Sequence, residues 1–184
     1  MFLRKSSLEP LPVTMSAVRM GERVLQIGID EPAIVTAIAA KVGLSGSAAI
    51  AVTENTDAER VTRAAAGAGL LIDVKVTPLA PLPYDSDSFD LVVVHATRGL
   101  VTSLDAAARV AAVREWNRVL RDGGRVMTIE SIHTGGLKAL LRRTPDNEGD
   151  PSGGILQTLQ AAGFHMSRVL AEREGFRFAE AIKT

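Results

Sequence analysis

Residues 24–32 have the sequence VLQIGIDEP, and this stretch decides the fold. Residues 23–28 are mostly apolar and have the length of a short buried strand. Gly28 suits a turn after that strand, because glycine adopts backbone angles that other residues avoid. Pro32 favours the first turn of a helix, and Asp30 is placed to cap that helix. The stretch therefore predicts a strand, a tight turn and a helix in succession.

The same order of strand and helix continues along the chain. FDLVVV at residues 89–94 is apolar throughout, as expected for a central parallel strand that is buried on both faces. Other short apolar runs have the length of strands as well. These further strands are predicted at residues 48–52, 71–76 and 125–129, with two closing strands at 166–171 and 176–182.

Segments with apolar residues at helical spacing lie between these strands, and glycines follow them. The second predicted helix begins at Asn55 or Thr56, either of which can cap it. A third helix spans about 104–121, with Gly123-Gly124 as its stop, and a fourth covers about 155–162. Strands that alternate with helices predict a parallel sheet with helices on both faces. A tight turn joins the two closing strands, so one of them is expected to run antiparallel.

Length and composition restrict the class of protein. The chain has 184 residues, which predicts one domain over residues 1–184. We interpret residues 1–20 as a short N-terminal arm and residues 131–154 as an insert. The 21 basic and 21 acidic side chains cancel, which argues against a nucleic-acid partner, since such partners need clustered positive charge.

Several kinds of site and location are not supported. The chain has no cysteine, so disulfide and thiolate chemistry are excluded. No His, Asp or Glu residues have metal-ligand spacing, so no metal is expected. No apolar run reaches the roughly 20 residues that span a bilayer, and the N-terminus lacks the apolar core of a secretory signal. We therefore expect a cytoplasmic protein that does not bind membranes.

Four segments together resemble the class I S-adenosylmethionine-dependent methyltransferases that act on small molecules. Each segment is weakly specific alone, but their order and spacing are typical of the family, and the resemblance extends from about Gly21 to Lys183, nearly the whole chain. The segments are GERVLQIG at 21–28, LPYDSDSFDLVVV at 82–94, REWNRVLRDGGRVMTIE at 114–130, and LQAAGFHMSRV at 159–169 followed by FRFAEAIK at 176–183.

The resemblance implies a Rossmann-like, doubly wound α/β fold. Its sheet has seven mostly parallel strands, with helices on both faces and a C-terminal antiparallel hairpin, in agreement with the pattern above. It also implies S-adenosylmethionine as cofactor and a small molecule as methyl acceptor. The residues implied at the cofactor are Gln26, Gly28 and Asp30 in the first loop, Thr53 or Glu54 at the ribose hydroxyls, and Leu79 and Ala80 at the adenine.

The first loop departs from the family pattern of acidic-x-Gly-x-Gly-x-Gly. Gln26 stands at the acidic position, and only the first glycine, Gly28, remains. Asp30 and Pro32 replace the other two glycines, and Pro78 stands where the family carries an acid near the adenine. Glycines in such a loop let the backbone approach a ligand closely. Asp30 could contact the cationic end of the cofactor, or its side chain could fill the pocket.

His95 is the candidate catalytic residue. It ends the strand predicted at 89–94, and ligands of open α/β sheets bind at the carboxyl ends of the strands. Histidine titrates near neutrality, so His95 could act as a general base or contact the acceptor. A buried, hydrogen-bonded histidine is the other interpretation. Thr97 and Arg98 follow on the same loop and could line the pocket, and His133 could face it from the insert.

Two functions remain open at this point. The first is methyl transfer to a small molecule, with residues 131–154 as the best lid candidate because the N-terminal arm is short. The second is a methyltransferase-like protein that has lost S-adenosylmethionine binding and serves as a binding or scaffold protein, since a fold does not carry its function with it. A homodimer or a protein partner is compatible with either function.

Overall fold

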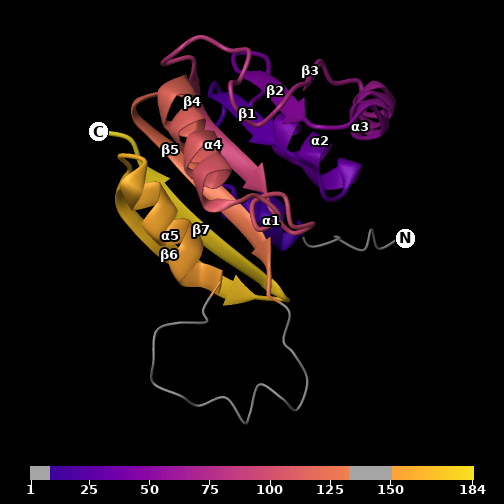
Figure 1. Cartoon of the computed structure of the whole chain (residues 1–184). Helices are drawn as coiled ribbons and strands as arrows, with labels where there is room; N and C mark the ends of the chain where they lie inside the picture. Colours follow the sequence, from indigo (N-terminus) through magenta and orange to yellow (C-terminus); the bar gives the residue numbers. More distant parts are fainter. Residues whose placement is uncertain (1–8, 133–150) are drawn as a thin grey trace.

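The computed structural model describes residues 9–132 and 151–184. Their centre is one seven-stranded sheet in the order β3-β2-β1-β4-β5-β7-β6 (Figure 1). All neighbouring strands pair in parallel except β7, which is antiparallel to both β5 and β6. The strands are β1 (Arg23–Ile27), β2 (Ser47–Val52), β3 (Asp73–Val76), β4 (Phe89–His95), β5 (Leu120–Ser131), β6 (His165–Arg173) and β7 (Phe176–Ile182). The predicted fold class, with its antiparallel closing hairpin, is confirmed.

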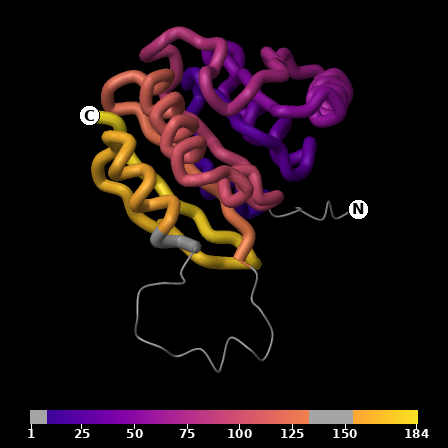
Figure 2. The backbone as a smooth tube through the Cα atoms, viewed as in Figure 1, coloured from indigo at the N-terminus to yellow at the C-terminus, as the bar shows by residue number. Residues whose placement is uncertain are grey.

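Helices cover both faces of this sheet (Figure 2). The apolar side chains of α4 (Ala106–Val119) and α5 (Pro151–Ala161) pack on one face, around the buried ring of Trp116. The other face carries α1 (Leu11–Met15), α2 (Pro32–Lys41) and α3 (Asn55–Ala68). Within the described residues, no helix is long and apolar enough to cross a membrane.

The start of α2 differs from its predicted form. Its N-cap is Glu31, which makes no capping hydrogen bond through its side chain, and Pro32 follows at the first position. Asp30 does not cap the helix, because its carboxylate accepts a hydrogen bond from Thr97 instead. The hydroxyl of Thr97, far along the chain, has thus taken the place of the helix N–H groups that the sequence suggested as partners of Asp30.

The N-terminal arm contains the short helix α1, whose Val13 is buried against the sheet. Two further helix ends differ from their predicted form. Glu54 is the N-cap of α3, so Asn55 and Thr56 lie in its first turn and do not cap it. Helix α4 ends at Val119, before the predicted Gly123-Gly124 stop, because β5 pairs with β4 from Leu120 onward. Most of the insert, with His133 and the lid prediction, lies outside the described residues.

Candidate functional site

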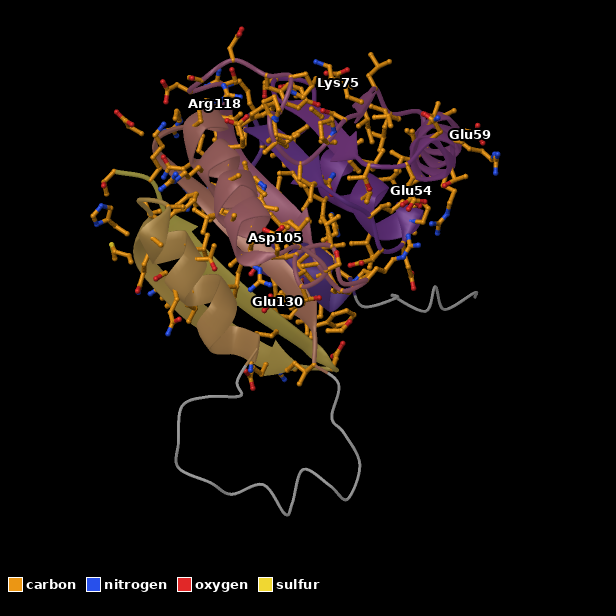
Figure 3. All side chains as sticks on the ribbon, in the orientation of Figure 1. Glu54, Glu59, Lys75, Asp105, Arg118 and Glu130 are labelled. Carbon is orange, nitrogen blue, oxygen red and sulfur yellow. The ribbon has the colours of Figure 1, made fainter. Side chains whose placement is uncertain are left out.

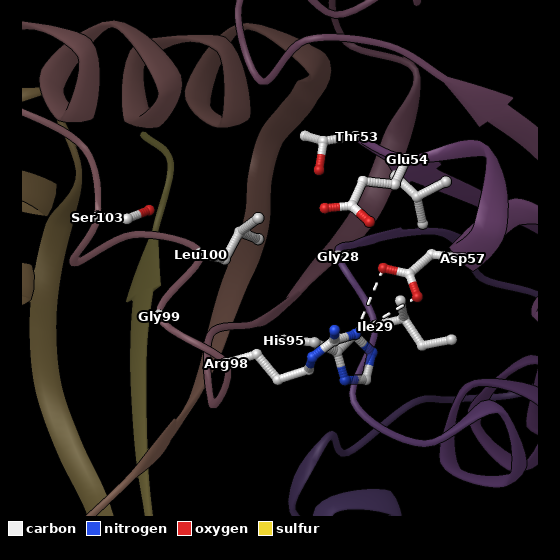
Figure 4. A pocket seen from close by; sticks show the side chains of 11 residues that line it. Gly28, Ile29, Thr53, Glu54, Asp57, His95, Arg98, Gly99, Leu100 and Ser103 are labelled. Carbon is white, nitrogen blue, oxygen red and sulfur yellow. Dashed lines mark hydrogen bonds and ion pairs between the residues drawn. The ribbon is translucent and has the colours of Figure 1, made fainter.

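A pocket of about 200 Å³ opens at the carboxyl ends of β1, β2 and β4 (Figure 4). Strand β1 lies between β2 and β4. The chain therefore winds outward in opposite directions on the two sides of β1, and open α/β sheets bind ligands at such a switch point. The pocket is lined by Gly28, Ile29, Val52, Thr53, Glu54, Asp57, His95, Arg98, Gly99, Leu100 and Ser103.

Gly28 forms the turn at the base of the pocket. Its φ angle is +73°, which strongly favours glycine, and its N–H donates to the carbonyl of Ala51 at 2.9 Å. A Cβ at this position would lie 3.0 Å from the carbonyl oxygen of His95 and 2.6 Å from Cδ2 of Leu100. The glycine is thus required by backbone angle and by space, as its place in the loop predicted.

His95 is held by polar groups beneath the pocket. Its ring is fully buried, and Nε2 lies 2.9 Å from Oε1 of Gln26. Gln26 in turn donates from Nε2 to the carbonyl of Val35 at 2.9 Å, so Oε1 must accept and His95 Nε2 must donate. The ring therefore carries its proton on Nε2 when neutral, and Nδ1 has no hydrogen-bond partner.

The Nδ1 atom of His95 faces the carboxylate of Asp30 at 3.7 Å. Asp30 is mostly covered, with 12% of its side chain exposed, and it also accepts the hydrogen bond from Thr97. Neither Gln26 nor Asp30 is among the residues that line the pocket. Both support it from below, by fixing His95 and the loop that follows β4.

Glu54 and Thr53 lie at the rim of the pocket, at the end of β2, where they were expected. Asp57 lies in the first turn of α3 and pairs with Arg60 at 2.9 Å and with Arg98 at 3.4 Å. Figure 4 shows the Arg98 contact across the mouth of the pocket. The rim therefore combines two carboxylates with one guanidinium.

Leu79 and Ala80 do not line this pocket. Leu79 packs on the apolar cluster around Trp116, in the loop between β3 and β4. Their predicted contact with an adenine stays a prediction. Among the described residues, no group of His, Asp or Glu could hold a metal ion.

Sequence reasoning missed Asp57, Gly99, Leu100 and Ser103 as pocket residues, although Arg98 lines the pocket as predicted. A signal was present, because three of these four lie between β4 and α4, directly after a strand end at the ligand-binding edge. Nothing in the sequence showed that this segment folds back over Gly28.

Comparison with known proteins places this pocket in a family. The family model described as a methyltransferase domain matches residues 25–128, more than half of the chain. The chain belongs to the class I S-adenosylmethionine-dependent methyltransferase family. The matched residues contain β2 to β4 and most of β1 and β5, and with them every residue that lines the pocket.

Solved structures share the fold at low sequence identity. A SAM-dependent methyltransferase from Aquifex aeolicus has a TM-score of 0.71 and 14% identity, over 94% of this chain and 87% of that chain. One from Methanosarcina mazei has a TM-score of 0.70 and 22% identity, over 96% and 99%. PigF, solved with SAH, has a TM-score of 0.64 and 19% identity, over 89% and 51%. No curated protein shows significant sequence similarity to the chain.

Proposed function

We propose that this protein binds S-adenosylmethionine in the pocket and transfers its methyl group to a small-molecule acceptor. One observation carries the proposal: Gly28 and Glu54, from two successive strand-to-helix loops, line the same pocket. These are the positions at which the family resemblance implies the closely approached loop and the ribose contact.

The residues fit the nucleoside part of the cofactor. The carboxylate of Glu54 is exposed at the rim and can accept hydrogen bonds from both ribose hydroxyls. Ile29 and Val52 supply apolar surface beside it. The space over Gly28, where the methionyl end would run, is covered by Leu100. The methionyl end therefore fits only if Leu100 moves.

When bound, the cofactor supplies an electrophilic methyl group on a sulfonium centre. The protein then has to exclude water and to align the acceptor with that methyl group. His95 remains our candidate for contact with the acceptor. Its Nε2 is bonded to Gln26 and its Nδ1 is buried facing Asp30, so this contact requires the ring or Asp30 to move.

Titration with S-adenosylmethionine and S-adenosylhomocysteine, followed by calorimetry and thermal unfolding, tests the proposal. A ligand at about 100 times its dissociation constant stabilises a native state by about 2.7 kcal/mol. We expect Glu54→Gln to weaken binding by roughly tenfold or more, because a hydrogen bond to a charged group contributes about 1.5–3 kcal/mol. Glu59→Gln is the matched control, since Glu59 is exposed on α3 and lies outside the pocket.

An unchanged affinity in Glu54→Gln would show that the ribose contact is misplaced. The absence of any heat or thermal shift with wild-type protein at millimolar ligand would favour the second function, a binding or scaffold protein without the cofactor. That alternative has its own support, since the loop keeps a single glycine and Leu100 packs directly on it.

A further inference from the structure

The segment of residues 97–104, between β4 and α4, lies over the pocket and contacts the loop after β1 and the first turn of α3. Thr97 donates to Asp30 in the loop after β1. Arg98 pairs with Asp57 beyond the loop after β2. Leu100 is seated on the open side of Gly28. Figure 4 shows Arg98, Gly99 and Leu100 along one side of the pocket and Glu54 and Asp57 along the other.

Leu100 removes much of the space that the site offers at Gly28. Its Cδ2 and Cγ lie 2.6 and 3.7 Å from the position that a Cβ on Gly28 would take. The pocket that remains, about 200 Å³, is below the roughly 300–1,000 Å³ of a typical small-molecule site. Glu54 and Thr53 stay open at the opposite rim.

We infer that Leu100 is a specificity-determining residue, which controls whether a ligand with an amino-acid tail can enter beside Gly28. A nucleoside without such a tail needs only the side of the pocket near Glu54. A ligand with the tail has to displace Leu100 first. This inference rests on the proposed function, because it names the part of S-adenosylmethionine that meets the obstacle.

Two features of the segment favour such a displacement of the Leu100 side chain. The Arg98–Asp57 pair is long, at 3.4 Å, and the Arg98 side chain is 56% exposed, so the pair contributes little to holding the segment. Asp57 keeps its shorter contact with Arg60 when Arg98 leaves. Leu100 itself is only partly buried, at the border of the cluster around Trp116.

The test compares S-adenosylmethionine with 5′-methylthioadenosine, which keeps the nucleoside and the sulfur but lacks the amino-acid end. Leu100→Ala is expected to tighten S-adenosylmethionine binding by about tenfold, as when a binding-competent state rises from about 10% to nearly all of the population. Binding of 5′-methylthioadenosine should change little. Leu104→Ala is the matched control, since Leu104 lies in the same segment, is also partly buried, and does not line the pocket.

An unchanged or weaker affinity of Leu100→Ala for S-adenosylmethionine, or an equal gain for both ligands, overturns the inference and leaves the proposed function standing. If wild type and variant bind neither ligand, the proposed function fails, and a second readout decides on Leu100. The chain has no cysteine, so Ile29→Cys, at a position that is 3% exposed, gives a single thiol in the pocket wall. Leu100→Ala should raise its labelling rate several-fold and Leu104→Ala should not; equal rates overturn the inference.

Discussion

Gln26 stands where the family pattern has an acidic residue, and its neighbour explains the amide. His95 lies on β4, two residues beyond the residue that pairs with Gln26; it is fully buried and needs an acceptor for Nε2–H. An amide supplies that acceptor and, from its other end, a donor for the carbonyl of Val35. A carboxylate would satisfy His95 but would lose the side-chain hydrogen bond to the carbonyl of Val35 and add a buried charge, which is costly. The altered loop residue and the histidine thus form one hydrogen-bonded unit.

We predict that Gln26→Met lowers the free energy of unfolding by about 1–3 kcal/mol, because it leaves the buried Nε2–H of His95 without a partner and removes the side-chain bond to the carbonyl of Val35. With His95→Phe added, the loss should be smaller than the sum of the two single losses, since the unpaired ring nitrogen is then gone. Urea unfolding of the four proteins of this cycle measures the coupling. Thr128→Val is the control, because its buried hydroxyl has no partner to lose. Additive losses would contradict a coupled pair.

For single residues, the sequence predicted which residues lie at the pocket better than it predicted where their side chains point. Gly28, Thr53, Glu54 and His95 line the pocket because parallel strands end at one edge, which a hydrophobic pattern is sufficient to locate. The direction of each side chain depends on partners far along the chain. The histidine ring points to Gln26, 69 residues earlier, so no local pattern could show that its Nε2 is already used.

Helix α4 holds the loop between β3 and β4 through an ion pair near its C-terminal end (Figure 3). Arg118 donates two hydrogen bonds to Glu115, both at 2.8 Å, and reaches the carbonyls of Leu82 and Tyr84. Glu115 also accepts from the N–H of Leu82 at 2.7 Å. Hydrogen bonds from Arg118 hold the pKa of Glu115 below its ordinary value, although burial acts in the opposite direction.

The lowered pKa fixes the sign of a pH effect. The carboxylate stabilises the fold above its unfolded-state pKa of about 4.3, and this stability is lost as the pH falls through the lower pKa of the folded state. Glu115→Gln should therefore cost about 1.5–3 kcal/mol at pH 7 and much less in strong acid. Urea unfolding at a series of pH values measures this, with Glu59→Gln as control. A cost that does not change with pH would argue against the ion pair.

The sequence predicted which helices and strands form, but not the residues at which the helices begin and end. Apolar spacing located every strand that the structure describes, because burial on a sheet imposes that spacing. Helix ends depend on competition between local and distant partners. Asp105 does cap α4, accepting from the N–H of Ala108, whereas Asp30 is taken by Thr97 and leaves α2 without a side-chain cap. Asp105 stands at the N-cap position itself, whereas Asp30 lies one residue before the N-cap Glu31 and is bonded to a distant residue.

The molecule as a whole depends on the antiparallel strand β7, which lies between β5 and β6. Phe178 in β7 pairs with Ile129 of β5 and Ala171 of β6, and its ring is fully buried on the sheet face that carries α1 and α2. Trp116 belongs to α4 and is buried against the opposite face. The closing hairpin thus adds side chains to a core that the whole sheet shares. Its two strands were predicted from the sequence as the antiparallel end of the sheet.

This arrangement predicts that both faces unfold together. Phe178→Ala should lower the free energy of unfolding by about 3–5 kcal/mol, as for other buried phenylalanines. Trp116, the only tryptophan, reports the other face by fluorescence, while circular dichroism reports the whole sheet. If the sheet is one cooperative unit, the two signals should shift to the same lower midpoint.

Val169→Ala is the control, because Val169 lies on the edge strand β6 with 38% of its surface exposed, and it should have a much smaller effect. A fluorescence midpoint that stays at its wild-type value while the dichroism midpoint falls would mean that the hairpin and its face unfold separately, and that the sheet joins two independent layers.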